Sequence, residues 1–303
     1  MRIRTSLAIA TAAGAVALGA LAAPAAQADE ASAGSKAMAY VNGVHADAKA
    51  AAEGQAKSGV KSGVRSGVTT VVGDVTIDKV TVNGNQDIVA GTSAKKTVNV
   101  YVTATDPEGI SDAYAMLWHG TSFDEEHVDG VIIPEQQEAD CDNWSATSAT
   151  CKITLTVDPS WDLYDSSLAG KWNVYAGALA NDGDVMDNDT YKNVWIKRAA
   201  QITSMNAAPE PVKKGKTITA TANLSRASWS YLKYYGYGSQ SAQLQFAKAG
   251  SSTYTTVKTV KTSSTGALKA TATASTSGTW RFYFPKNSTT SAATSAGDYV
   301  AVN

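Results

Sequence analysis

Beyond residue 68, the chain is built from short runs in which apolar and polar residues alternate. In residues 97–105, Val98, Val100 and Val102 share one face of an extended strand, and mainly polar residues share the other. The same β-branched and aromatic character, divided by Gly, Asp-Pro and Asn-Gly turn signals, predicts strands at 75–83, 113–119, 131–134, 151–157, 171–180 and 192–197. Seven strands in about 130 residues are typical of a β-sandwich.

The second half of the chain repeats this pattern. Strands are predicted at 217–225, 241–248, 254–262, 267–275, 279–284 and 298–303. Gly and Ser separate them, and no helical pattern of comparable length competes after residue 68. The sequence therefore predicts an all-β protein with two sandwiches in tandem, over residues 69–199 and 200–303.

The first 28 residues have the features of a secretory signal peptide. Arg2 and Arg4 precede an apolar, Ala-rich run, and an Ala-Gln-Ala cleavage site ends at Ala28. No later stretch approaches the roughly 18 apolar residues that a membrane-spanning helix needs. The sequence predicts a secreted bacterial protein without a transmembrane segment, whose mature chain begins at Asp29.

Residues 29–68 are rich in Ala, Gly, Ser and Lys, and they end in three repeats, KSGV, KSGV and RSGV, at 57–68. A glycine in every turn of a helix costs about 1 kcal/mol relative to alanine. We therefore expect a flexible spacer or prosegment, with at most a frayed helix near 36–56. Its regularly spaced cations also fit contact with an anionic cell wall.

Charge divides the chain into two unlike halves. Residues 69–199 carry 8 basic against 21 acidic residues, a net charge of −13, whereas residues 200–303 carry 11 against 2, a net charge of +9. This asymmetry favours two domains with different surfaces. It also fits head-to-tail self-association between the acidic half of one molecule and the basic half of another.

Cys141 and Cys151 are the two cysteines of the chain. An even pair in an oxidising compartment predicts a disulfide. A metal site is less favoured, because no Cys-x-x-Cys spacing and no nearby histidine accompany them.

Two segments of the first half, VTATDPEGISDAYA (102–115) and GKWNVYAGALANDGD (170–184), resemble bacterial immunoglobulin-like modules. The segment 244–284 is similar to the terminal immunoglobulin-like module of secreted actinobacterial-type proteins, some of which are described as calcium-binding. The resemblance implies immunoglobulin-like topology for both sandwiches. It implies little about function, because one fold serves many functions.

With that topology, 97–105 is strand B and 171–180 is strand F, so TDPEGISD and NDGDVMDNDT become the B–C and F–G loops at one end of the sandwich. The acidic residues expected to converge there are Asp106, Glu108, Asp112, Asp182, Asp184, Asp187 and Asp189. Carboxylates from two adjacent loops suit Ca²⁺, which takes six to eight oxygen ligands. The spacing does not match an EF-hand, and the same residues are also typical of solvated turns or of docking to a basic partner.

A second candidate surface combines aromatic and basic residues in the second half. These residues are Arg226, Trp229, Tyr231, Lys233 and Tyr235. Aromatic rings beside cations predict binding of a glycan or an anionic cell-wall polymer, whereas nucleic acid is not expected for a secreted protein. Alternation along a strand would instead place some of these rings in the core.

Catalysis is not expected. The chain has three histidines, His45, His119 and His127, and none lies in a motif typical of hydrolases, metalloenzymes or nucleotide-binding enzymes. The sequence therefore predicts a secreted, non-catalytic binding or structural protein.

Overall fold

The computed structural model describes residues 31–53, 69–142 and 144–303. The predicted signal peptide and the KSGV repeats lie outside these residues. Within them, no helix combines the length and the apolar character needed to cross a membrane.

The first sandwich consists of two largely antiparallel sheets that face each other across one core. Its strands are β1 (Thr69–Val72), β2 (Thr76–Val82), β3 (Ile88–Ala90), β4 (Lys96–Thr105), β5 (Ile110–Gly120), β6 (Val128–Ile132), β7 (Asp140–Asp142), β8 (Ser148–Val157), β9 (Gly170–Ala180) and β10 (Val185–Arg198). Short 3₁₀ turns follow β2 (η1, Asn83–Asn85) and precede β9 (η2, Ser166–Leu168).

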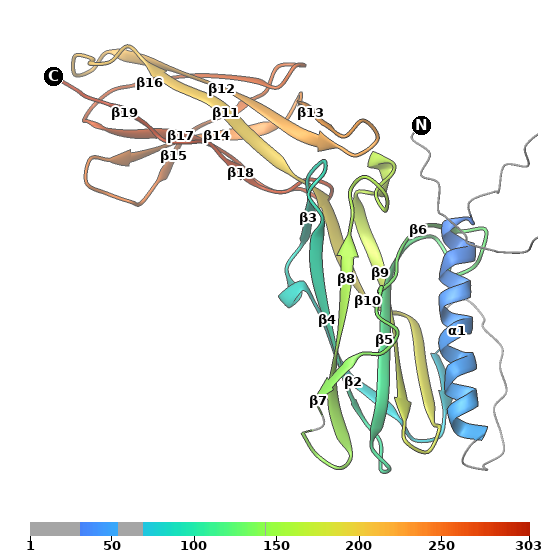
Figure 1. Ribbon diagram of the computed structural model, residues 1–303. Helices are drawn as coiled ribbons and strands as arrows, with labels where there is room; N and C mark the ends of the chain where they lie inside the picture. Colours follow the sequence, from blue (N-terminus) through green and yellow to red (C-terminus); the bar gives the residue numbers. More distant parts are fainter. Residues whose placement is uncertain (1–30, 54–68, 143) are drawn as a thin grey trace, which may run out of the picture. The chain divides into compact units, whose positions relative to one another are not determined.

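The strand order of the first sandwich is immunoglobulin-like. One sheet runs β1-β10-β9-β5-β6, with β3 joined in parallel to β10, and the other runs β2-β4-β8-β7. β4, β5, β9 and β10 therefore take the places of strands B, C, F and G (Figure 1). This order confirms the predicted all-β fold and places the β4–β5 and β9–β10 turns at the same end.

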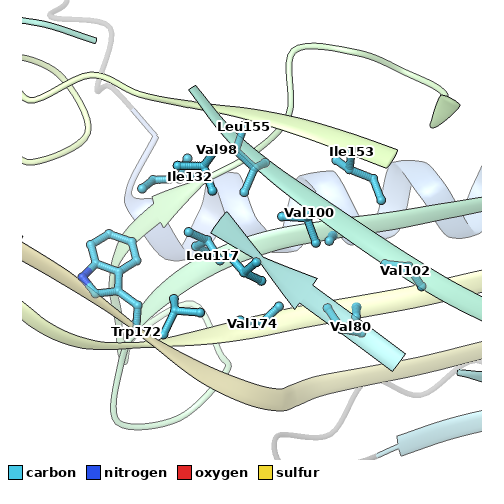
Figure 2. Packing of buried hydrophobic residues seen from close by; sticks show 14 of the residues in the cluster. Val80, Val98, Val100, Val102, Leu117, Ile132, Ile153, Leu155, Trp172 and Val174 are labelled. Carbon is cyan, nitrogen blue, oxygen red and sulfur yellow. The ribbon is translucent and has the colours of Figure 1, made fainter. Parts of the chain in front are cut away.

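The core of this sandwich follows from the alternation of residues in the sequence. Figure 2 shows Val98, Val100 and Val102 of β4 pointing toward Leu117 of β5 and Val174 of β9. Each of these five side chains is fully buried. Burial of one such side chain contributes about 1.5–3 kcal/mol, so this face determines the register of the sheets.

The second sandwich has its own core. Its strands are β11 (Ala200–Ala208), β12 (Thr217–Ser228), β13 (Lys233–Gly236), β14 (Ser241–Lys248), β15 (Thr255–Lys261), β16 (Ala267–Thr273), β17 (Gly278–Phe284), β18 (Ala293–Thr294) and β19 (Asp298–Val300). In one sheet, β12 pairs with β11, β13 and β16; in the other, β15-β14-β17-β18 are adjacent and β19 pairs with β17. Leu224, Leu244 and Phe282 are fully buried between the sheets.

A helix covers the outer face of the first sandwich. α1 (Ala33–Glu53) lies along the sheet that contains β5 and β9 (Figure 1), and its Ala37 and Val41 are buried. Their neighbours in the sheet and in the β5–β6 connection are mainly aromatic: Tyr114, Met116, Trp118, Phe123 and Tyr175. At the start of the helix, Ser35 Oγ donates a hydrogen bond to Glu125 Oε1 at 2.5 Å.

This docked helix differs from the flexible spacer predicted over 29–68. The prediction considered only the intrinsic helix propensity of the segment, which its glycines lower. Packing against an aromatic sheet face supplies the missing stability, as it does for most helices in proteins. The difference applies to 33–53 alone, because 54–68 lie outside the described residues.

The predicted disulfide is confirmed. Cys141 of β7 and Cys151 of β8 stand opposite each other in the antiparallel pair, with their Cα atoms 3.9 Å apart, and their sulfurs are bonded. The bond fastens β7, a strand of three residues, to the edge of the sheet.

Candidate functional site

Three chain segments meet at one end of the first sandwich. They are the β1–β2 connection (73–75), the β4–β5 turn (106–109) and the β9–β10 turn (181–184). Asn181 joins the two turns, because its backbone N–H donates to Gly109 O at 2.9 Å and its side-chain amide donates to Glu108 O at 2.8 Å. The site is thus assembled by the ends of strands that the core already holds in register.

The close approach of the turns depends on Gly109. Its φ is +87°, a conformation that glycine adopts without strain. A Cβ added there would lie 2.7 Å from the carbonyl oxygen of Ala146 and 2.9 Å from the Asn181 amide nitrogen. The Asp-Pro-Glu-Gly turn therefore brings Asp106 and Glu108 against the β9–β10 turn.

Five carboxylates gather where these segments meet. Asp74, Asp106 and Asp184 form one group, and Asp106, Glu108 and Asp182 form another: Asp74, Asp106, Glu108, Asp182 and Asp184. Within each group, one oxygen from each side chain lies within 4.8 Å of the others. Asp106 belongs to both groups and so stands at the centre of the site.

Asp106 is fully buried, with 0% of its surface exposed. Its Oδ1 accepts a hydrogen bond from the Glu108 N–H at 2.8 Å. Among the described residues, its Oδ2 is the buried side-chain oxygen or nitrogen without a hydrogen-bond partner. A buried carboxylate with an unsatisfied oxygen is costly, so this group calls for a ligand.

The electrostatics of the site also favour a cation. Burial, and then the nearby charges of Asp182, Asp184 and Glu108, raise the pKa of Asp106. Burial likewise raises the pKa of Asp184, and Asp182 and Asp74 add to this effect. Hard carboxylate oxygens supplied by turns are the ligands that Ca²⁺ prefers, and a divalent charge would offset their mutual repulsion.

Four of the seven predicted ligands come together here: Asp106, Glu108, Asp182 and Asp184. Asp74 was not among the predicted ligands, although the Gly-Asp pair at 73–74 is a turn signal. Asp74 lies before strand B, whereas the predicted ligands were those of the B–C and F–G loops. The pairing of β1 with β10 is what brings Asp74 to the site.

Asp112 does not point into the site. Its Oδ1 accepts hydrogen bonds from the backbone N–H groups of Ala113 at 2.8 Å and Ala139 at 2.9 Å. Burial raises its pKa, and these two hydrogen bonds oppose the shift. The side chain thus ties β5 to the segment that leads into β7.

Asp187 and Asp189 are also elsewhere, and their assignment to the F–G loop is wrong. The turn ends at Asp184, and residues 185–190 already belong to β10. Asp187 and Asp189 are 2% and 4% exposed, and Asp187 bonds to His45 of α1 and to Tyr114 of β5. The Asp189 carbonyl accepts from the Trp118 indole N–H at 2.6 Å.

The predicted aromatic and basic residues of the second sandwich divide between surface and core. Trp229 is 1% exposed and packs in the core of the first sandwich, where its indole N–H donates to Ala90 O at 3.4 Å. The Arg226 guanidinium lies 4.0 Å from the ring centroid of Tyr237. Neither arrangement leaves its side chain free to stack on a ligand.

The other three residues of that set are on the surface. Tyr231 is 70% exposed, Tyr235 is 49% exposed, and their rings pack edge to face with centroids 5.8 Å apart. Lys233 lies between them in sequence and is exposed. These three side chains form an open aromatic and basic surface, which we call the tyrosine surface.

Each histidine is paired with an aspartate. His119 Nδ1 lies 2.5 Å from Asp129 Oδ1, and His127 Nδ1 lies 2.6 Å from Asp124 Oδ1. His45 pairs with Asp187. In the described part of the chain, the groups with metal-ligand spacing consist of carboxylates, and no histidine belongs to them.

No family model and no curated protein matches the chain. Among solved structures, it is similar to the D0-D1 domain of intimin, with 17% identity over 77% of this chain and 100% of that one, at a TM-score of 0.25. The D00-D0 domain of intimin gives 13% identity, 74% and 100% coverage and a TM-score of 0.26.

A third similarity, to dimeric latent PorU from Porphyromonas gingivalis, has 10% identity over 77% of this chain, at a TM-score of 0.25. This chain spans 20% of PorU. At such values these similarities carry no argument about function, and the strand order described above defines the fold.

Proposed function

We propose that this chain is a non-catalytic extracellular structural and binding module whose first sandwich holds a calcium ion. The ligands are the carboxylates of Asp74, Asp106, Glu108, Asp182 and Asp184, which we call the acidic end. The observation that carries the proposal is the unpartnered Oδ2 of the fully buried Asp106.

Solvated turn chemistry explains this arrangement less well. A turn-forming aspartate is ordinarily exposed, and water satisfies the oxygens that its backbone partners leave free. Asp106 has no exposed surface, and four other carboxylates surround it. A cation among these carboxylates would supply the missing partner of Asp106 Oδ2. It would also replace the repulsion between the carboxylates by attraction to the ion.

Calcium would act here as a structural cross-link. Extracellular modules bind calcium with dissociation constants of about 10⁻⁴–10⁻³ M, so moderate geometry is sufficient. An ion bound by three segments would hold the end of the sandwich rigid, as expected for a protein that acts mechanically or by display at a cell surface. It would also stabilise the folded state by mass action.

Calorimetric titration of calcium into the EDTA-treated mature chain tests the proposal. We expect binding at millimolar concentration or tighter, together with a calcium-dependent rise in melting temperature. Asp106→Asn should abolish both effects while leaving the melting temperature in EDTA unchanged or higher, because one repelling charge is gone. Asp182→Asn/Asp184→Asn should behave alike.

Glu135→Gln is the matched control, because Glu135 is an exposed carboxylate of the same sandwich outside the acidic end. It should titrate like the unaltered chain. If the unaltered chain shows no binding heat and no change in melting temperature with calcium, the proposal is wrong. These aspartates would then be solvated turn residues.

The tyrosine surface supports a second candidate function, the binding of a glycan or an anionic cell-wall polymer. Two exposed rings in edge-to-face contact beside a lysine offer stacking and a cation together. Sedimentation with cell-wall polysaccharide should be lost in Tyr231→Ala/Tyr235→Ala. It should persist in Tyr299→Ala, which removes a similarly exposed ring from β19.

A further inference from the structure

The acidic end adjoins β1, a short strand at the edge of the first sandwich. We propose that calcium at the acidic end fastens β1 to β10, so that the ion controls whether this edge of the sheet is closed. The inference rests on the calcium site proposed above and adds a regulatory consequence to it.

β1 ends at Val72, two residues before Asp74 of the acidic end. It pairs with the first four residues of β10, from Thr69 opposite Asn188 to Val72 opposite Val185. Asp184 directly precedes β10, and Asp74 follows β1 by two positions. The two ligands therefore lie on the two chain segments whose pairing is in question.

The β1 segment passes directly against the carboxylate of Asp184. The Asp74 N–H donates to Asp184 Oδ2 at 2.9 Å. Gly73 has a φ of +81°, and a Cβ added there would lie 1.4 Å from the same oxygen. Glycine is what allows the chain to turn at this point and carry Asp74 across to the site.

β1 has little else to hold it. It contains four residues, its Val71 is 52% exposed, and Thr70 and Val72 are only partly buried. Short edge strands with few buried contacts open at low free-energy cost. Without a cation, the charges of Asp74, Asp106 and Asp184 repel one another and oppose closure. A bound calcium ion converts the same three groups into a bridge.

β1 covers one of the two segments of β10 that pair with a short strand. β3 covers β10 from Ile196 to Arg198, and β1 covers it from Val185 to Asn188. If β1 detaches, the backbone N–H and C=O groups of that second segment lose their partners. An open edge of this kind accepts a strand from another chain, and a closed edge does not.

Hydrogen exchange measured by mass spectrometry on the mature chain, with and without calcium, tests the inference. At calcium about ten times above its dissociation constant, exchange over 69–72 should slow by about tenfold, because calcium binds the closed state. Exchange over the central strand β4 should not change. Calorimetry on the same samples reports binding independently.

The outcomes separate the two proposals. Calcium heat with unchanged exchange over 69–72 would overturn the role of calcium in fastening β1 and leave the site intact. Absence of heat would overturn both.

Asp74→Asn provides the second arm, because the other four carboxylates remain to bind calcium. Weaker binding together with loss of protection over 69–72 supports the inference, whereas full protection contradicts it. Glu135→Gln should match the unaltered chain in both measurements.

Discussion

Nε2 of His45 lies 2.5 Å from Oδ2 of Asp187, a residue 142 positions further along the chain. The hydroxyl of Tyr114 donates to the other oxygen of the same carboxylate. Asp187 is 2% exposed, so both of its oxygens are satisfied away from solvent. The contact fixes α1 to β10, and it gives Asp187 the role of a helix anchor.

The docking of α1 should depend on pH. The hydrogen bond to Asp187 raises the pKa of His45, although burial of the ring opposes the shift. A group whose pKa is higher in the folded state stabilises that state below its unfolded pKa of about 6.5, and this stability is lost as the pH rises through the folded value. We expect α1 to be less protected at pH 9 than at pH 6, by about 1.5–3 kcal/mol, the value of a hydrogen bond to a charged group.

Protection factors from hydrogen exchange over 33–53 measure this dependence. His45→Gln should remove it, giving similar protection of α1 at both values of pH. Equal protection of α1 in the unaltered chain at pH 6 and pH 9 would show that the ion pair does not hold the helix.

Val41 tests whether the helix is packed or merely tethered. It is 1% exposed and lies in the cluster formed by α1 and the aromatic sheet face. Val41→Ala removes two methylene equivalents and should cost about 1.5–2 kcal/mol. Asn42→Ala changes the exposed neighbouring position and should have little effect. Thermal unfolding that does not distinguish the two variants would mean that the helix adds nothing to stability.

Most strands that alternation predicted agree with the structure to within a few residues, because one face of each is buried. The exception is 192–197, which misses the first seven residues of β10 (Val185–Arg198). The segment 241–248 coincides with β14, and 97–105 with all but the first residue of β4. β1, β3 and β7 were not predicted, because strands of three or four residues are too short to show a period. β11 carries a positive φ at Ser204 and a register shift, which interrupt its alternation.

The candidate site was predictable in part for a similar reason. Turn residues next to long strands, such as Asp106 and Asp184, follow from topology. Asp187 did not, because eight of the ten residues in 181–190 are polar or glycine and conceal the point at which β10 begins. Trp229 could not be placed from the sequence, because its burial depends on a contact between two sandwiches that no local pattern records.

Loss of the disulfide should destabilise the first sandwich. Chain entropy for a loop between Cys141 and Cys151 corresponds to about 2.8 kcal/mol. Cys141→Ser/Cys151→Ser should therefore lower the melting temperature of the first sandwich and increase exchange over β7. An unchanged melting temperature would show that the pairing of β7 with β8 suffices without the bond.

Opposite charges on the two halves predict association that depends on salt. Within one chain, Lys286 Nζ and Lys197 Nζ already lie 2.8 and 3.0 Å from Asp87 Oδ2. At 0.01 M ionic strength, where the Debye length is about 30 Å, light scattering should detect oligomers that dissociate by about 0.15 M. Lys258→Glu/Lys261→Glu, on the exposed face of β15, should weaken them. A monomer at low salt in EDTA would contradict pairing by charge.

Trp229 gives the clearest separation of a structural role from a binding role. The residue follows β12 of the second sandwich, yet its indole is 1% exposed within the core of the first. Trp229→Ala should cost about 3–5 kcal/mol and lower the unfolding transition of the first sandwich. Tyr231→Ala removes a ring that is 70% exposed and should leave both transitions in place. If Trp229→Ala instead abolished polysaccharide binding at unchanged stability, the indole would belong to a ligand surface and its structural role would be wrong.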